Sequence, residues 1–216
     1  MNKKIQVKTM VLLAMLAAVA FMMVALIRIP VVLFLSYEPK DVVITIGGFL
    51  LGPLASFVIS LLVALVEMVT ISTTGPIGCL MNLLSTACFA CTAAIIYKKN
   101  RSLLGAVLGL MLGSVGMIAV MLLWNWLITP LYMGTPREAV EQMLIPTFLP
   151  FNALKAGLNS ALTLLLYKPL VAALRKTGLI PQRSTAQKST KWGIYLLGGV
   201  LLVTCILLLL VLRGIL

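Results

Sequence analysis

The chain has 216 residues, of which 62% are hydrophobic and only 10% are charged, and it contains no histidine. A soluble domain needs a more polar surface, so this composition indicates an integral membrane protein. The apolar segments are long and do not alternate with period two, which excludes an outer-membrane barrel and favours a bundle of spanning helices. The net charge of +12 lies mainly in short segments between the apolar runs, where basic residues set membrane topology and do not indicate nucleic-acid binding.

A spanning helix needs about 20 apolar residues. The apolar segments of this chain, in order, cover residues 9–27, 42–51, 54–72, 77–97, 103–128, 146–174 and 192–212. The second segment is too short to cross a bilayer at about 1.5 Å per residue, so it is either a shortened span or a partly re-entrant segment. The last segment is nearly all leucine and valine and is predicted to be an appended, lipid-facing anchor. We therefore expect a membrane domain over residues 1–178, a polar cytoplasmic linker over 179–191 and an additional transmembrane helix over 192–216.

The distribution of charged residues predicts the orientation of the bundle. If the N-terminus is cytoplasmic, twelve lysines and arginines fall on the inner side and four on the outer side, which is the bias typical of membrane proteins. Of the five acidic residues, Glu38, Asp41, Glu138 and Glu141 fall in or beside the outer loops. Only Glu67 lies within an apolar segment, so it is a candidate functional residue.

One apolar segment, residues 146–174, carries a polar stripe. At about 100° per residue, Asn152, Lys155, Asn159 and Thr163 lie on one helix face. Lys155 lies roughly 13 Å below the outer end of the segment, where an ammonium is costly unless other groups compensate it. We therefore expect this face to point into the bundle. The alternative is that the asparagines form interhelical hydrogen bonds and that Lys155 extends its amine towards water.

Two other segments bring polar side chains to a similar depth in the outer half of the bilayer. Glu67 lies roughly 9 Å and Asn125 roughly 7 Å below the outer ends of their segments. Trp124 offers a surface on which a ring can stack, although tryptophans are equally common at membrane interfaces without a ligand. Together these residues predict an outward-facing pocket for a small polar or amphipathic molecule. In that pocket Glu67 either pairs with Lys155 or accepts hydrogen bonds from ligand hydroxyls.

The sequence lacks the motifs of several enzyme classes. It has no G-x-x-x-x-G-K-[ST] phosphate loop, no H-E-x-x-H motif and no serine–histidine pair, which disfavours a membrane enzyme and places any energy source in partner proteins. Cys88 and Cys91 form a C-x-x-C pair without a second pair or a histidine, so we interpret them as packing residues and expect no metal site. Ala14 and Ala18 lie one turn apart in the first apolar segment, a spacing that allows close approach either of a partner protein or of another helix of the bundle.

Three stretches resemble a known family: "EPKDVVITIGGFLLGPLASFVISLLVALVEMVTISTTGPIG", "WNWLITPLYMG" and "LPFNALKAGLNSALTLLLYKPLV". They are similar to the riboflavin-specific S-components of energy-coupling factor (ECF) transporters, the RibU type, and the likeness runs over about residues 1–178. The resemblance implies an all-α integral membrane protein with a six-helix S-component bundle and a cytoplasmic N-terminus, in the cell membrane of a bacterium. The seventh apolar segment, an appended C-terminal helix, departs from the six helices of the family.

The resemblance also implies a function. Such a subunit binds riboflavin tightly from outside as its transported ligand, needs no cofactor, and associates with a transmembrane coupling subunit and two ATP-binding-cassette ATPase subunits. The family's binding positions match Asn125, Asn152 and Lys155, and the loop that folds over the ligand is "IPVVLFLSYEPKD", which contains Tyr37. Ala14 and Ala18 match the surface that docks to the coupling subunit. The alternatives are flavin mononucleotide or another vitamin as ligand, or a membrane scaffold that transports nothing.

Overall fold

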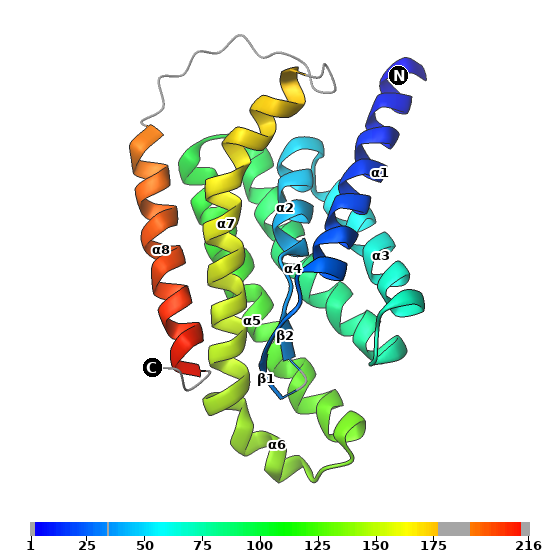
Figure 1. The fold of residues 1–216 in the computed structure, drawn as a ribbon, viewed down its shortest axis with the longest axis vertical. Helices are drawn as coiled ribbons and strands as arrows, with labels where there is room; N and C mark the ends of the chain where they lie inside the picture. The colour runs from blue at the N-terminus through cyan, green and yellow to red at the C-terminus, as the bar shows by residue number, and fades with distance from the viewer. Residues whose placement is uncertain (1–2, 34, 177–190, 213–216) are drawn as a thin grey trace.

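The computed structural model describes residues 3–33, 35–176 and 191–212, and most of them are helical (Figure 1). The helices are α1 (Lys3–Leu26), α2 (Lys40–Leu51), α3 (Pro53–Thr70), α4 (Gly75–Lys99), α5 (Leu103–Met133), α6 (Arg137–Met143), α7 (Leu149–Lys176) and α8 (Lys191–Leu212). A π-helical turn, η1 (Leu144–Phe148), joins α6 to α7. Five helical segments in the described part of the chain are long and apolar enough to span a membrane. The prediction of an all-α membrane bundle is confirmed, and its six-plus-one helix count is approximately matched.

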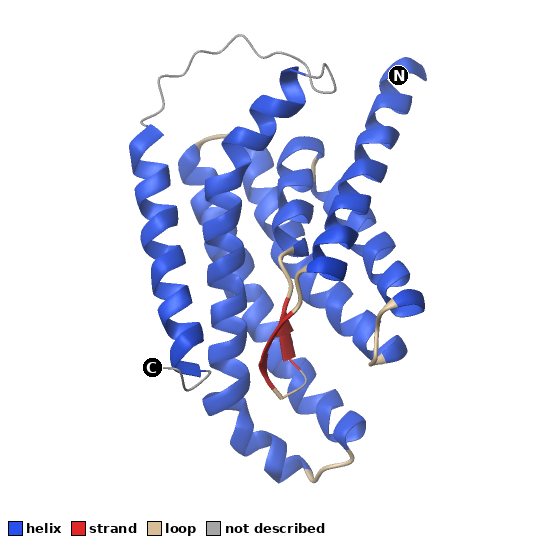
Figure 2. Ribbon diagram, viewed as in Figure 1, coloured by secondary structure: helices blue, strands red, loops and turns tan. Residues whose placement is uncertain are grey.

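The segment between α1 and α2 forms a hairpin that was not predicted. Strands β1 (Ile29–Val32) and β2 (Leu35–Tyr37) pair antiparallel, with an irregularity between Pro30 and Val32. Figure 2 shows the two strands inside the lower half of the bundle, between α7 and the other helices. This is the end of the molecule to which the charge distribution assigns the outside. The hairpin therefore lies within the outer half of the helix bundle.

Two predicted helix boundaries differ from the structure at prolines. The sequence predicts that the fifth segment ends before Pro130, but α5 continues through this proline to Met133. Gly134 follows as the C-cap, and its φ of 64° closes the helix in the left-handed conformation. The sixth was expected to begin at Pro146, which instead lies in η1, and α7 begins three residues later at Leu149. A proline removes one backbone donor, and both sites accommodate that loss near the outer end of a helix.

The short helix α2 lies at the centre of the bundle. It contacts α1, α3, α4 and α7, and all of its residues from Lys40 to Phe49 are buried. Its 12 residues extend about 18 Å, too short to span a bilayer alone. Gly48 permits this close packing, because a Cβ there would lie 2.0 Å from Ser56 Oγ and 2.8 Å from Ala94 Cβ.

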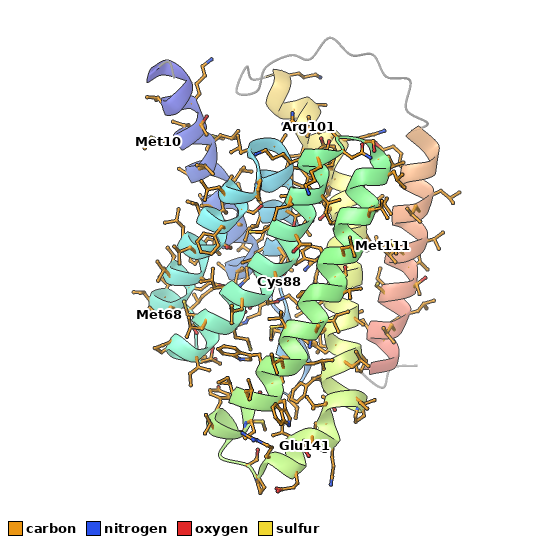
Figure 3. The ribbon with its side chains drawn as sticks, turned by 180° about the vertical axis from the view of Figure 1, so that it is seen from behind. Met10, Met68, Cys88, Arg101, Met111 and Glu141 are labelled. Carbon is orange, nitrogen blue, oxygen red and sulfur yellow. The ribbon has the colours of Figure 1, made fainter. Side chains whose placement is uncertain are left out.

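Helices α4 and α5 pack closely along a row of glycines. A Cβ on Gly109 would lie 2.8 Å from the carbonyl oxygen of Ala93, and one on Gly113 would lie 2.6 Å from that of Phe89. Small residues four apart allow such backbone contact between membrane helices. The opposite surface of α5 is apolar and exposed. Met111, which is 60% exposed, lies on it as Figure 3 shows from behind the molecule, as expected for a lipid-facing helix.

The additional helix α8 packs along α7, on the side of the bundle away from α1 (Figure 1). Two glycines permit the contact, because a Cβ on Gly157 would lie 2.6 Å from Cys205 Sγ and one on Gly198 would lie 2.9 Å from Leu165. The same helix also reaches β1 of the hairpin. One face of α8 is thus packed against the bundle, although the sequence predicted a helix that only faces lipid. Most of the predicted linker, residues 179–190, lies outside the described residues.

Candidate ligand-binding site

The segment from β2 into α2 carries the charged residues of the site. β2 ends at Tyr37 and α2 begins at Lys40, so Glu38, Lys40 and Asp41 enter the bundle within one helical turn. Glu38 is 4% exposed, Lys40 is 1% exposed and Asp41 is fully buried. Asp41 lies in the first turn of α2, where the helix dipole favours a carboxylate. Buried charges need partners, and the structure provides one for each of these three.

Lys40 is the centre of one ion-pair network. Its Nζ lies 2.6 Å from Oε2 of Glu67 on α3 and 2.8 Å from Oε2 of Glu38. Arg28 pairs with the other oxygen of Glu38, with 3.0 Å between Nε and Oε1. Asn82 on α4 donates from Nδ2 to Glu67 Oε2 at 3.4 Å. This network connects the hairpin and α2 to α3 and α4.

Asp41 is the centre of a second network, which joins α2 to α4 and α7. Thr86 donates from Oγ1 to Asp41 Oδ1 at 2.6 Å, and Asn159 donates from Nδ2 to Asp41 Oδ2 at 2.9 Å. Tyr37 donates from its hydroxyl to Asn159 Oδ1 at 3.1 Å. Burial raises the pKa of Tyr37, and the negative charge of Asp41 raises it further. The phenol is therefore neutral over the physiological range and remains a donor.

Lys155 completes the second network. Its Nζ lies 3.4 Å from Asp41 Oδ2 and 3.4 Å from Ser85 Oγ, and the residue is 6% exposed. Both distances are long for a charged donor, and an ammonium has three protons to donate. The two networks together hold three carboxylates (Glu38, Asp41, Glu67) and three cations (Arg28, Lys40, Lys155). Their formal charges cancel, so the site is strongly polar without a net charge.

A pocket lies against these networks, on the side facing the hairpin. Its wall includes charged, amide, hydroxyl and apolar side chains: Arg28, Leu35, Ser36, Glu38, Thr74, Met81, Asn82, Ser85, Met121, Phe151, Asn152 and Lys155. The empty space next to these side chains measures about 530 Å³, including space that is open to solvent. Leu35 and Ser36 come from β2, so the hairpin forms one wall of the pocket. A small molecule at this wall would therefore meet both polar and apolar side chains.

The predicted stripe on α7 points inward. Asn152 is 2% exposed, and Asn159 and Thr163 are fully buried, as Lys155 nearly is. Asn152 and Lys155 line the pocket, whereas Asn159 lies behind it in the Asp41 network. Asn152 donates from Nδ2 to the carbonyl oxygen of Phe148 at 2.7 Å within its own helix, so its Oδ1 is the group that can meet a ligand donor.

Other predicted residues lie next to the pocket rather than in its wall. Glu67 pairs with Lys40 and not with Lys155, whose carboxylate partner is Asp41. Asn125 is fully buried and donates to the carbonyl oxygen of Met121 at 2.8 Å on its own helix. Trp124 lines a separate small gap near the outer ends of α4 and α5. The roles of these residues towards a ligand remain predictions.

Several residues of the networks were not singled out from the sequence. The sequence predicts Glu38 and Asp41 in or beside the outer loops, because the second apolar segment begins at about residue 42. The α4 residues Asn82, Ser85 and Thr86 had a usable signal: their spacing of three and four places them on one helix face. This polar face on α4 is the counterpart of the stripe on α7.

Most of the chain is similar to proteins of one family. Residues 8–167 match the family described as ECF transporter, substrate-specific component. The chain belongs to this family. The match ends within α7, so α8 of this S-component lies beyond it.

Relatives of this S-component carry riboflavin in their names. The riboflavin transporter RibU of Staphylococcus aureus (strain TCH60) is 28% identical over 180 residues, which are 79% of this chain and 94% of that protein. The riboflavin transporter FmnP of Bacillus subtilis (strain 168) is 26% identical over 162 residues, which are 69% of this chain and 85% of that protein. A solved structure of the S component of a bacterial ECF transporter is 29% identical, with a TM-score of 0.67 over 79% of this chain and 99% of that one.

The small residues of α1 lie on the surface of this S-component. Ala14 and Ala18 are exposed, whereas Leu12, Leu16 and Ala20 on the other face are buried in the bundle. Packing inside the bundle therefore does not account for these two alanines. Their face of α1 is free to meet another helix.

Proposed function

We propose that this S-component captures riboflavin from outside a bacterial cell and delivers it to an ATP-driven importer. The observation that carries the proposal is the electroneutral pocket under the hairpin, where α7 presents a cationic donor and an amide acceptor side by side. Riboflavin is neutral, with ring carbonyls and ring nitrogens that accept hydrogen bonds, one ring N–H that donates, and a chain of hydroxyls. The relatives named as riboflavin transporters support the same ligand.

The pocket matches the hydrogen-bonding groups of riboflavin. Lys155 has donor capacity for a ring carbonyl beyond its long contacts to Asp41 and Ser85. Asn152 Oδ1 suits the ring N–H, because it is the acceptor of an amide whose Nδ2 is anchored to the Phe148 carbonyl within α7. Phe151 and the apolar residues of the wall suit the ring faces. The networks behind the pocket, including Tyr37, Asn159 and Glu67, hold these groups in place.

The charge balance favours riboflavin over its phosphate ester. The three carboxylates and three cations of the site already neutralise one another. A phosphate would add about two negative charges next to Glu38, a carboxylate in the pocket wall, and the two cations of that wall, Arg28 and Lys155, are already paired with carboxylates. Flavin mononucleotide should therefore bind more weakly than riboflavin.

Partners supply the energy in this proposal. The S-component would dock to a transmembrane coupling subunit and two ATP-binding-cassette ATPases, and ATP use would reorient the bundle so that the pocket opens inward. The exposed face with Ala14 and Ala18 suits the helix-to-helix contact with the coupling subunit. The N-terminus would be cytoplasmic, and the chain would need no cofactor and catalyse no reaction of its own.

Residues 1–178 would form the binding domain, and residues 192–216, after a linker over 179–191, would form an appended transmembrane helix. Tyr37, Leu154, Leu158 and Cys205 form one buried apolar cluster between the hairpin, α7 and α8. We propose that α8 holds the hairpin in its closed position over the pocket. This role would slow ligand exchange without contacting the ligand.

Titration of riboflavin fluorescence with the purified protein tests the function. We expect saturable quenching with one ligand per chain. In competition for bound radiolabelled riboflavin, flavin mononucleotide should be at least several-fold weaker than unlabelled riboflavin. Absence of quenching by a folded preparation would refute the proposed ligand. Stronger competition by the mononucleotide would instead assign the phosphate ester as substrate.

A further inference from the structure

Tyr37 connects the hairpin to α7 behind the pocket wall. It ends β2 and is only 4% exposed, but it is not among the described residues that line the pocket, although its neighbours Ser36 and Glu38 are. Its ring instead belongs to the buried apolar cluster that includes Leu154 and Leu158 of α7. The hydroxyl of Tyr37 therefore acts on the groups behind the pocket.

This hydroxyl fixes the orientation of the Asn159 amide. It donates to Asn159 Oδ1 at 3.1 Å, while Nδ2 of the same amide donates to Asp41 Oδ2 at 2.9 Å. An amide accepts through its oxygen and donates through its nitrogen, so the two contacts together allow only one orientation. All three side chains are buried, so water does not replace either contact. The position of β2 thus determines how Asn159 meets Asp41.

Asn159 and Lys155 compete for one oxygen of Asp41. They lie one turn apart on α7, and both face Asp41 Oδ2. The amide nitrogen lies 2.9 Å from this oxygen, whereas the ammonium lies 3.4 Å away. A charge-assisted bond is normally shorter, at about 2.7–2.9 Å.

The Asp41 carboxylate is also held from its other side. Thr86 donates to Oδ1 at 2.6 Å, so neutral donors fix both oxygens of the carboxylate. A carboxylate held in this way does not close on Lys155. The ammonium therefore stays at the pocket wall with capacity to donate to a ligand.

We propose that Tyr37 is a positioning residue that controls whether Lys155 can donate to the ligand. While β2 is in place, the Tyr37 hydroxyl holds Asn159 on Asp41, and the ammonium remains free for the ligand. When β2 moves away, Asn159 loses this restraint, and Asp41 draws Lys155 into a close ion pair. The hairpin thus acts on ligand affinity through Lys155, in addition to forming one wall of the pocket. This inference rests on the proposed function of riboflavin capture.

Tyr37→Phe, measured in two backgrounds, tests the proposal. This change removes the hydroxyl and keeps the ring in its apolar cluster. In the wild-type background, the Kd for riboflavin from fluorescence quenching should rise roughly 3- to 10-fold, because one neutral hydrogen bond is lost. In the background Asp41→Asn/Lys155→Met, which lacks both members of the ion pair, the same change should leave the Kd of that background unaltered. A contact of Tyr37 with the ligand, or a general effect on the hairpin, would give the same loss in both backgrounds.

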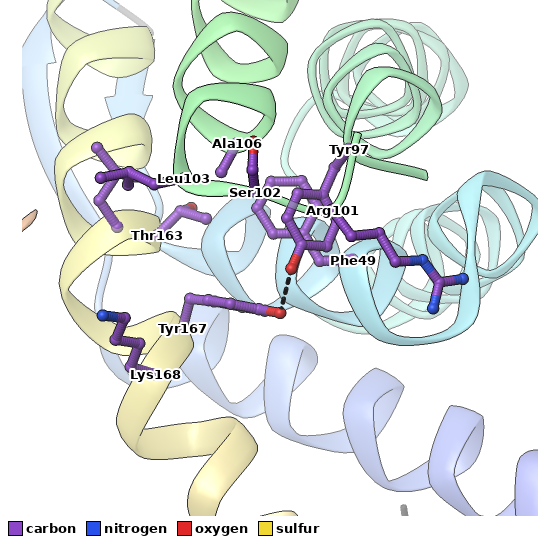
Figure 4. A pocket seen from close by; sticks show the side chains of 10 residues that line it. Phe49, Tyr97, Arg101, Ser102, Leu103, Ala106, Thr163, Tyr167 and Lys168 are labelled. Atoms are coloured by element: carbon purple, nitrogen blue, oxygen red, sulfur yellow. Dashed lines mark hydrogen bonds between the residues drawn. The ribbon is translucent and has the colours of Figure 1, made fainter. Parts of the chain in front are cut away.

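A second buried tyrosine provides a matched control. The Tyr97 and Tyr167 hydroxyls hydrogen-bond to each other at 2.5 Å, at the end of the bundle that the charge distribution assigns to the cytoplasm (Figure 4). Tyr97→Phe also removes one hydrogen-bonded hydroxyl and should leave the Kd for riboflavin unchanged.

Three results would overturn the positioning role: an unchanged Kd for Tyr37→Phe in the wild-type background, an equal loss in both backgrounds, or an equal loss in Tyr97→Phe. A folded wild type that binds no riboflavin would instead refute the proposed function, and the positioning role with it.

Discussion

The role of Lys155 can be separated from its ion pair with Asp41 by two variants. Lys155→Met alone removes the cation 3.4 Å from Asp41 Oδ2 and leaves a fully buried carboxylate without its cation. Lys155→Met combined with Asp41→Asn removes both charges. In the double variant, the new amide can accept from Asn159 and donate to Thr86, so the hydrogen bonds of the network can be kept.

The two variants should differ in stability and agree in affinity. Removing one partner of a buried pair costs about 3 to 5 kcal/mol, whereas replacing both by neutral groups is often close to neutral. The single variant should therefore melt at a clearly lower temperature, and the double variant should recover most of the loss. A lost hydrogen bond from a charged donor to the ligand costs about 1 to 3 kcal/mol, or roughly 5- to 150-fold in Kd. That loss should persist in the double variant.

Riboflavin fluorescence quenching and thermal unfolding of the same preparations provide the two readouts. The expected result is a double variant with nearly normal stability and a riboflavin Kd still raised within the stated range. If the double variant binds riboflavin as tightly as the wild type, Lys155 serves only to neutralise Asp41, and its assignment as a ligand donor is wrong.

Other parts of the structure give four further predictions. Ala18→Trp, on the exposed face of α1, should leave riboflavin affinity unchanged and abolish co-purification with the coupling subunit; retained co-purification contradicts the docking role. Gly113→Val should lower the free energy of unfolding by about 1 to 3 kcal/mol, and with it the melting temperature, because the valine side chain meets the backbone oxygen of Phe89. An unchanged melting temperature would show that α4 and α5 can separate without cost. Deleting residues 191–216 should speed riboflavin dissociation through loss of the α8 contact with β1, and an unchanged rate contradicts bracing of the hairpin. Burial raises the pKa of Tyr37, so its phenol should stay protonated at pH 10, the ordinary pKa of tyrosine. The wild type and Tyr37→Phe should therefore show the same tyrosinate absorbance at that pH. A wild-type signal that exceeds the variant's by half a tyrosinate would contradict the buried hydrogen bond of Tyr37.

The helix bundle could be predicted because membrane helices are encoded locally. A run of about 20 apolar residues suffices to mark a span, and the helical period alone placed Asn152, Lys155 and Asn159 on one inward face. The same period placed Ala14 and Ala18 together. These features need no knowledge of other segments, so they could be derived before the structure.

The partners of the buried charges could not be predicted, because they depend on contacts between distant segments. Asp41 and Asn159 are hydrogen-bonded across a sequence separation of 118 residues. The first turn of α2 is polar, and the sequence places it in or beside an outer loop, so Asp41 does not stand out as the partner of Lys155. The pairing of Glu67 with Lys40 depends on the same turn.

The hairpin and the contacts of α8 were missed for a related reason. Strands of four and three residues that include a proline leave almost no periodic signal. A helix as apolar as α8 has the composition of a lipid-facing anchor, and only the packing of Gly157 against Cys205 shows which face meets the bundle.

An experimental structure of the protein with riboflavin bound tests the central claim most directly. The account predicts that the flavin ring lies under the hairpin, with Lys155 Nζ and Asn152 Oδ1 within hydrogen-bonding distance of its polar edge. Flavin bound elsewhere, or an empty outer pocket at saturating riboflavin, would contradict it.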